Sequence, residues 1–257
     1  MPYQRTTGLS ATQFAMLITA LNNHLTCIKL DQKSPRLTLP QALKITLISY
    51  WYNLTQETLA YLFKVSQPTI SRTIATVEKV LAKVLEPLNR PLGESLKTPG
   101  SLVVEATLIP PWNWLSQGKI NFSGKDERAG FNYQVICTLD GRFLAIIDSL
   151  PGAEHDVYAF RAHGLEKLLN SSTLADKGYV GLGLASLTEC KPGQRLNREQ
   201  RRNNRVLNGL RSVVERVIAQ VKTWRILHTG FRRPLGFYGR VFSVVRGLVF
   251  LAAGHPL

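Results

Sequence analysis

Acidic residues are scarce in this sequence. Its 257 residues include 17 aspartates and glutamates against 32 lysines and arginines, which gives a formal net charge of +15. A surplus of positive charge this large favours a polyanionic partner, of which nucleic acid is the commonest. A basic protein that binds at a membrane surface is the alternative interpretation. With 44% hydrophobic residues the chain can bury a core, which excludes a disordered or fibrous protein.

Cysteine and long apolar runs are also lacking. Cys27, Cys137 and Cys190 are odd in number and have no CxxC spacing, so they predict neither a disulfide framework nor a zinc site. No uninterrupted apolar run approaches the roughly 18 residues that a membrane span needs, and no signal peptide is recognised. The stretch VFSVVRGLVFLAAG is interrupted by Arg246 and is expected to be a helix that closes the core. We therefore expect a soluble, intracellular protein without a membrane partner.

The first ninety residues have helical periodicity and helix-capping signals. Ser10 with Gln13, and Thr38 with Gln41, form capping-box patterns, each followed by apolar residues at helical spacing. The segment of about residues 55–77 has the layout of a helix-turn-helix, with a tight turn at Lys64. The residues expected to meet DNA from its second helix are Gln67, Thr69, Ser71 and Arg72. The alternatives are a purely structural helical hairpin and, for the long second helix, a dimer seam.

A polar segment rich in proline and glycine, residues 89–101, is the best linker in the chain. It separates an expected helical DNA-binding domain, residues 1–92, from a second domain, residues 101–257. In the second domain SLVVEATLIP predicts a strand, and FNYQVICTLDGRFLAIID predicts two strands joined at Asp140-Gly141. A helix, a short strand ending at Asp176 and a basic helical segment follow. This order predicts a mixed α/β domain.

Three carboxylates of the second domain stand in unusual places. Glu105 and Asp176 lie in apolar strands, where a buried acid is costly unless it is paired or binds a metal. Glu215 lies on a helix and shares one stripe with Arg211 and Lys222. Acids from two adjacent strands and a covering helix can hold two divalent ions about 3.5 to 4 Å apart, as in phosphodiester chemistry. The alternatives are a tight turn that explains Asp176 and a surface salt bridge between Arg211 and Glu215.

Residues 101–257 resemble the DDE transposases of bacterial insertion sequences, in particular the family conventionally numbered five, and more distantly Harbinger-type elements. The matching segments are VVEATLIP, SGK, SLPGAEHDVYAF, LADKGYVGL, LNREQRRNN and LRSVVERVIAQVKTWRIL. The first domain resembles the helix-turn-helix domain of the same proteins. The most specific match is the spacing of Arg211, Glu215 and Lys222. The resemblance implies a ribonuclease H-like fold in which Glu105, Asp176 and Glu215 are catalytic and bind two Mg²⁺ or Mn²⁺ ions.

The resemblance also implies roles for neighbouring residues. Arg211 and Lys222 would hold DNA phosphates beside the ions, and His155 with Asp156 would be accessory. Further contacts to DNA are expected from Lys125, Lys177, Arg201 and Arg202, although the arginine-rich segment QRLNREQRRNNR could also be only a solvated helix face. The implied partner is double-stranded DNA, namely transposon ends and target. The implied state is a homodimer or higher multimer in the bacterial cytoplasm, associated with the nucleoid.

One departure from the family bears on activity. Glu105 stands where the family has aspartate, and the added methylene moves the carboxylate outward by about 1 to 1.5 Å, whereas catalytic groups need placing within about 0.5 Å. The resemblance nevertheless implies a transposase that binds terminal inverted repeats and catalyses metal-dependent strand cleavage and strand transfer. The alternative is a transposase-derived DNA-binding or regulatory protein with an impaired active site. A basic structural protein is a third interpretation.

Overall fold

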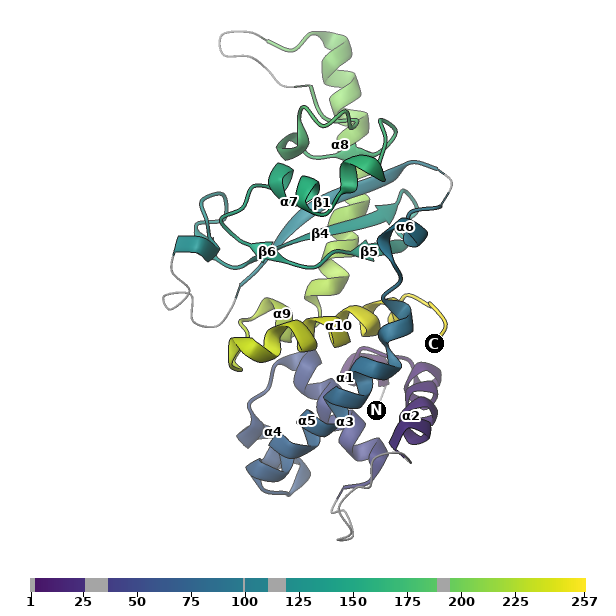
Figure 1. Ribbon diagram of the computed structural model, residues 1–257, viewed down its shortest axis with the longest axis vertical. Helices are drawn as coiled ribbons and strands as arrows, with labels where there is room; N and C mark the ends of the chain where they lie inside the picture. Colours follow the sequence, from purple (N-terminus) through teal and green to yellow (C-terminus); the bar gives the residue numbers. More distant parts are fainter. Residues whose placement is uncertain (1–2, 26–36, 99, 111–118, 189–194) are drawn as a thin grey trace. The chain divides into compact units, whose positions relative to one another are not determined.

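The computed structural model describes residues 3–25, 37–98, 100–110, 119–188 and 195–257, apart from the side chain of Lys177 (Figure 1). By packing, the chain forms two compact units. One unit consists of Met1–Arg90 with Val221–Leu257, and the other of Pro91–Gln220. The domains expected from the sequence were divided differently, because residues 221–257 were assigned to the second domain. In the structure their apolar side chains pack against the N-terminal helices.

The helical unit contains α1 (Tyr3–Thr7), α2 (Ala11–Leu25), α3 (Leu39–Tyr52), α4 (Gln56–Phe63), α5 (Gln67–Val84), α9 (Arg225–His228) and α10 (Tyr238–Ala252). The capping boxes predicted at Ser10 and Thr38 are formed. The backbone N–H groups of both residues donate to the glutamine three positions later, at 2.9 and 2.8 Å. The Gln13 side chain also donates to the carbonyl of Leu251, 2.8 Å away, so a helix start in the N-terminal segment is tied to the end of α10.

The helix α10 is one of the most buried elements of the helical unit. Val241, Val245 and Leu248 are fully buried, and Gly247 lies so close to Leu85 that a Cβ there would be 2.6 Å from the Leu85 Cβ. Among the described helices, Leu235–Ala252 has the length and hydropathy for a membrane crossing, with mean hydropathy 1.4 and 56% of the window buried. Burial in the helical core accounts for that composition, as the sequence predicted.

The predicted helix-turn-helix is formed by α4 and α5. The Thr55 hydroxyl caps α4 by accepting from the Thr58 N–H at 3.2 Å. Lys64 ends the helix with a left-handed backbone, φ 54°, and the N–H of Val65 returns to the carbonyl of Ala60 at 3.1 Å. This is the hydrogen bond of a Schellman motif, which satisfies a carbonyl that the helix end would leave unpaired. The apolar residues between the helices are Ile45, Leu59, Ile70 and Ile74, with Ala60, Phe63 and Val65 at the edge.

The second unit is built on a mixed sheet with the order β5-β4-β1-β7, and β6 pairs with β4. The strands are β1 (Leu102–Ile109), β4 (Phe131–Thr138), β5 (Phe143–Ile146), β6 (Leu150–Pro151) and β7 (Leu174–Ala175), and a small separate ribbon joins β2 (Phe122–Ser123) to β3 (Arg128–Ala129). The strands β1 and β4 are antiparallel, whereas β1 and β7 are parallel. The predicted turn at Asp140-Gly141 joins β4 to β5, with Gly141 at φ 87°.

Two helices cover opposite faces of this sheet (Figure 1). Val104 and Ile136 pack on one face with Phe160 of α7 (Asp156–Ala162) and with Tyr179. The other face is covered by α8 (Arg198–Lys222), whose buried residues Val213, Val214, Val217 and Ile218 recur at helical spacing. Helices on both faces of a mixed sheet confirm the predicted α/β class, and the strand order is that of a ribonuclease H-like domain.

Candidate active site

The pairing of β1 with β7 brings two of the predicted acids together. Val103 is paired with Leu174 and Val104 with Ala175, in parallel register. Glu105 is the next residue of β1, and Asp176 directly follows the end of β7. Because side chains alternate along a strand, both acids lie on the same face as Val103, which is the face covered by α8. The sequence predicted each acid separately, and the register explains why they meet.

A single guanidinium joins these acids. Arg211 of α8 donates through Nη2 to Glu105 Oε2 at 2.6 Å, and its Nη1 lies 3.1 Å from Asp176 Oδ1. The three side chains are largely withdrawn from solvent, at 12%, 11% and 24% exposure for Arg211, Glu105 and Asp176. One positive charge faces two negative charges, so this group, which we call the acid pair with Arg211, carries a formal charge of −1.

The surroundings of Glu105 disfavour its negative charge. Burial raises the pKa of the Glu105 carboxyl, the hydrogen bond and charge of Arg211 oppose that rise, and Asp176 adds to it. Burial, followed by the charges of Asp156, Glu105 and Asp176, also raises the pKa of Tyr179 well above its usual value. Tyr179 Oη and Arg211 Nε are buried and have no hydrogen-bond partner within the part of the chain that the structure describes. The site thus holds unused hydrogen-bonding capacity.

Glu215 lies one helical turn beyond Arg211 but is not gathered with the other two acids. Its side chain is exposed, because it lies outside the buried stripe of α8. The alternative salt bridge between Arg211 and Glu215 is not formed, since Arg211 pairs with Glu105 and Asp176 instead. Lys222, near the end of α8, is half-buried. Across the described ranges, no three histidine, cysteine, aspartate or glutamate residues are placed to hold one metal ion.

The predicted accessory residues lie at the start of α7, on the other face of the sheet. Asp156 accepts a hydrogen bond from Asn132 Nδ2 at 3.0 Å and its carboxylate is 3.4 Å from Lys125 Nζ. Gln134 Nε2 donates to the backbone carbonyl of Asp156 at 2.9 Å. Both amides are buried on β4, where the apolar strand FNYQVICT has two polar residues two positions apart. That pattern was the available signal for these anchors, and the sequence reasoning missed it.

An open pocket of about 590 Å³ extends from the accessory residues to Asp176 of the acid pair. Its lining includes Asp176, Lys125, His155, Asp156 and Tyr158. Gly178 also lines it, and a Cβ at that position would be only 3.0 Å from Asp156 Oδ2. The absence of a side chain at residue 178 therefore allows Asp156 to lie beside the turn that follows Asp176.

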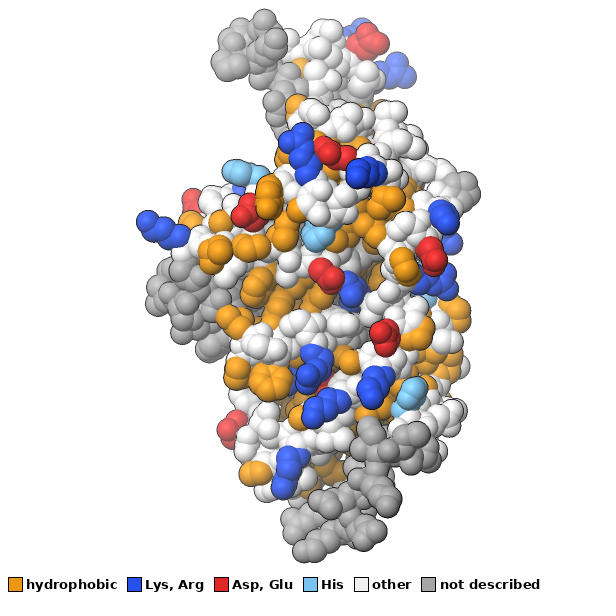
Figure 2. All heavy atoms as spheres, viewed as in Figure 1, with side chains coloured by type: hydrophobic (Ala, Val, Ile, Leu, Met, Phe, Trp, Pro, Cys, Tyr) orange, Lys and Arg blue, Asp and Glu red, His pale blue; other side chains and the backbone are white. Residues whose placement is uncertain are grey.

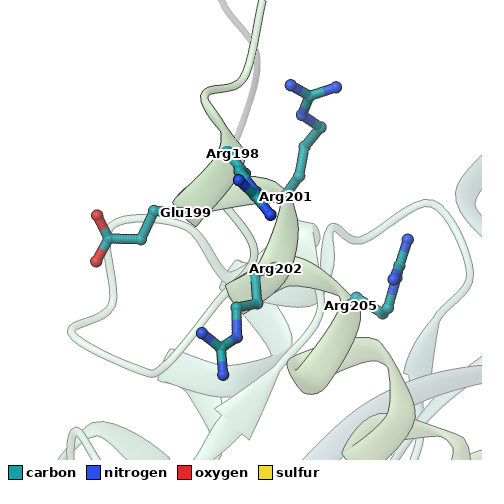
Figure 3. A pocket seen from close by; sticks show the side chains of 5 residues that line it. All are labelled: Arg198, Glu199, Arg201, Arg202 and Arg205. Atoms are coloured by element: carbon teal, nitrogen blue, oxygen red, sulfur yellow. The ribbon is translucent and has the colours of Figure 1, made fainter.

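The arginine-rich start of α8 forms a second open pocket, of about 960 Å³, in the same unit. It is lined by Arg198, Glu199, Arg201, Arg202 and Arg205. Figure 3 shows these arginines spreading outward from the first turns of the helix. They include both residues that the sequence singled out in this segment, and all are exposed. On the face drawn in Figure 2, lysine and arginine side chains are spread over both units.

The four residues predicted to contact DNA in the helical unit differ in availability. Gln67 is tied to Gln56 of α4 by a 2.5 Å hydrogen bond, and the Thr69 hydroxyl is 2.9 Å from that of Ser66. Ser71 is half-buried, whereas Arg72 is exposed. Arg72 is thus the most accessible of the four side chains.

The chain matches two described families along most of its length. Residues 107–250 match the DDE superfamily endonucleases, and residues 35–87 match the helix-turn-helix of DDE superfamily endonucleases. A protein of Streptomyces albus G, named as a transposase for insertion sequence element IS112, is 31% identical over 244 residues, which cover 93% of this chain and 90% of that protein. A protein of Microchaete diplosiphon, named as a transposase for element IS702, is 25% identical over 255 residues, with 96% and 92% covered.

No solved structure matches the chain. The family match covers more than half of its length, and the similarity to the Streptomyces protein extends over nearly all of it. The helix-turn-helix formed by α4 and α5, and the two acids side by side on β1 and β7, agree with that match. This chain belongs to the DDE superfamily of endonucleases and carries the helix-turn-helix domain of the same superfamily.

Proposed function

We propose that this protein is a DNA transposase that binds the terminal inverted repeats of its element and catalyses metal-dependent strand cleavage and strand transfer. The observation that carries the proposal is the acid pair with Arg211, in which two carboxylates on neighbouring strands converge on one cationic group. The similarity to the two relatives that are named as transposases extends over nearly the whole chain.

The donor set suits a hard divalent cation. Carboxylate oxygens are the ligands that Mg²⁺ and Mn²⁺ prefer, and the formal charge of −1 at the acid pair with Arg211 leaves room for further positive charge. Glu105 and Asp176 would hold the metal, and Glu215 would join them from α8. Bound there, two ions would activate a water and then a DNA 3′-hydroxyl, and would stabilise the leaving oxygen.

The other side chains have roles toward DNA in this proposal. Lys125, with 65% of its side chain exposed, lies at the rim of the pocket that leads to Asp176, where it can hold a phosphate. Asp156 and His155 also line that pocket. Lys222, Lys177, Arg201 and Arg202 would add contacts to the DNA backbone, and Gln67, Thr69, Ser71 and Arg72 would face the terminal repeats.

The first test is cleavage of a labelled duplex that carries the ends of the element, in Mg²⁺ and in Mn²⁺. The unchanged protein is expected to nick the duplex, and Glu215→Gln to lose nicking while still binding DNA. Glu105→Asp serves as the matched variant at the first acid. If only Glu105→Asp nicks, the proposed catalysis is wrong for this chain, and it is a DNA-binding descendant with an impaired site.

The second test separates recognition from general attraction. Arg72 lies near the start of α5 and Lys79 two turns later, and both are exposed. Arg72→Gln and Lys79→Gln each remove one positive charge, but only the first removes a side chain that meets base edges in this motif. We expect Arg72→Gln to reduce the preference for the element's ends over random DNA, by roughly tenfold or more. An equal loss in both variants would contradict the assignment of α5 as the recognition helix.

We further propose that two or more copies act together on the two ends of the element, in the cytoplasm and at the nucleoid. The support is the need to process both ends in one event. Mass measurement of the complex with end-carrying duplex checks this, and one protein per duplex at every concentration would contradict it.

A further inference from the structure

Arg211 contacts one oxygen of each of the two carboxylates that would hold a metal ion at this site. Its two terminal nitrogens reach Glu105 Oε2 and Asp176 Oδ1, one on each strand. A guanidinium is a permanent cation, so it compensates the two carboxylates when no ion is bound. Two cations cannot share these oxygens at full strength. A divalent ion held by both carboxylates would therefore compete with Arg211 for them.

The position of Arg211 is also incompletely satisfied. Its Nε is buried and has no hydrogen-bond partner among the described residues, although an arginine offers five N–H donors. Among the described residues, its ion-pair partners are the two acids. Moving the guanidinium outward would lose those two contacts but would relieve an unpaired buried donor. The arrangement therefore favours a guanidinium that can move away from the two acids.

The position of Arg211 on α8 allows its side chain to turn toward the exposed side of the helix. It lies at the edge between the buried stripe of Val214 and Ile218 and the exposed flank that holds Glu215. A DNA phosphate reaching this flank offers the planar guanidinium a bidentate partner with the same charge of −1 as a carboxylate. Phosphate and metal would then act in the same direction, since one attracts Arg211 and the other replaces it.

We propose that Arg211 is an internal counter-ion that occupies the Glu105–Asp176 pair in the ion-free protein and leaves it when DNA phosphate binds, so that DNA and a divalent cation bind cooperatively. The inference rests on the proposed metal-dependent function. It assigns Arg211 a positioning role that contact with phosphate alone does not imply. Because coupling is reciprocal, DNA raises the affinity for the metal by the same factor as the metal raises the affinity for DNA.

The test is Mn²⁺ binding by the full chain, measured from the free-ion electron paramagnetic resonance signal, with and without a short random-sequence duplex. In the unchanged protein we expect DNA to tighten Mn²⁺ binding by roughly tenfold. Arg211→Gln is expected to bind Mn²⁺ as tightly without DNA as the unchanged protein does with it, and to show little further gain. Arg216→Gln is the control, because it removes an exposed positive charge five positions further along the same helix.

Each outcome decides between the inference and the proposed function. If the unchanged protein and Arg211→Gln bind Mn²⁺ equally and DNA shifts both alike, the counter-ion role is wrong and the metal site stands. If neither binds Mn²⁺ even with DNA, both are overturned. Arg211→Lys, which keeps the charge but not the fork, covers the case of a misfolded glutamine variant. The Mn²⁺ affinity of Arg211→Lys without DNA should lie between those of the unchanged protein and Arg211→Gln. An affinity equal to that of the unchanged protein would count against the inference.

Discussion

Each unit of this protein contains a buried arginine–carboxylate group, and the two groups differ in composition. In the helical unit, Glu78 of α5 is fully buried and accepts from Tyr50 Oη at 2.6 Å and from both terminal nitrogens of Arg233. Burial, followed by the charge of Glu78, raises the pKa of Tyr50 well above its usual value, so the hydroxyl stays protonated as a donor. In the sheet unit, one arginine serves two acids.

The difference lies in the ratio of charges and in the satisfaction of donors. Glu78 and Arg233 are one anion and one cation, and both carboxylate oxygens of Glu78 are used. These contacts hold the segment before α10 against α5. Because the two charges balance, the group has no excess charge to attract a ligand. The acid pair with Arg211 has an excess negative charge and an unpaired Nε. A buried ion group that is incompletely balanced is a candidate for binding, whereas a balanced one serves the fold.

The largest effect expected is from breaking the balanced group. Arg233→Met should leave Glu78 buried without its cation and lower the free energy of unfolding of the helical unit by about 3–5 kcal/mol. Arg211→Met should cost less, because Asp176 lines an open pocket through which a cation from solution can reach it. Urea unfolding followed by circular dichroism, with and without Mg²⁺, measures both.

The comparison also predicts which variant Mg²⁺ restores. The ion should recover most of the stability lost in Arg211→Met and none of that lost in Arg233→Met. The triple variant Tyr50→Phe, Glu78→Leu, Arg233→Met is the control, since replacing both charges and the hydroxyl that donates to Glu78 by apolar groups is expected to be nearly neutral. Equal recovery of both arginine variants in Mg²⁺ would mean that the two groups do not differ as described.

A smaller effect is expected from filling two glycine sites, one in each unit. A Cβ at Gly247 of α10 would lie 2.6 Å from the Leu85 side chain, whereas one at Gly152 would lie 2.5 and 2.6 Å from two backbone carbonyls. Overpacking of this kind costs about 1–3 kcal/mol, and Gly152→Ala should be nearer the upper end because backbone yields less than a side chain. Differential scanning calorimetry measures the loss.

The matched controls for these sites are open glycines of the same units. Alanine at Gly239 of α10 or at Gly124 would meet no atom within 4 Å, so both variants should be neutral or slightly more stable. If Gly247→Ala were as harmless as Gly239→Ala, then α10 would not be packed on Leu85, and the grouping of residues 221–257 with the N-terminal helices would lose its support.

Local patterns predicted most of the fold and of the site residues. Capping pairs, the helix-turn-helix spacing and the Asp140-Gly141 turn are short-range signals, and each is present in the structure. The packing of α10 on the N-terminal helices was not predictable, because the apolar pattern of a helix does not indicate which elements the helix packs against. The pairing of Arg211 with the two acids was not predicted, for a similar reason. Its partners lie 106 and 35 positions away in sequence, and only the register of β1 with β7 brings them together.

The smallest effect concerns strained backbone at an exposed residue of each unit. Lys64 and Glu127 have left-handed φ values of 54° and 53°, and both side chains are exposed. This conformation costs a residue with a Cβ roughly 1–2 kcal/mol, and glycine avoids that cost but loses about 0.5–1 kcal/mol through the entropy of the unfolded chain. Lys64→Gly should therefore stabilise the helical unit, and Glu127→Gly the sheet unit, by about 0.5–1 kcal/mol each. Urea unfolding with a probe for each unit measures both, and Lys79→Gly within α5, where φ is helical, should instead destabilise. A gain from Lys79→Gly as well would show that loss of charge, not relief of backbone strain, is responsible.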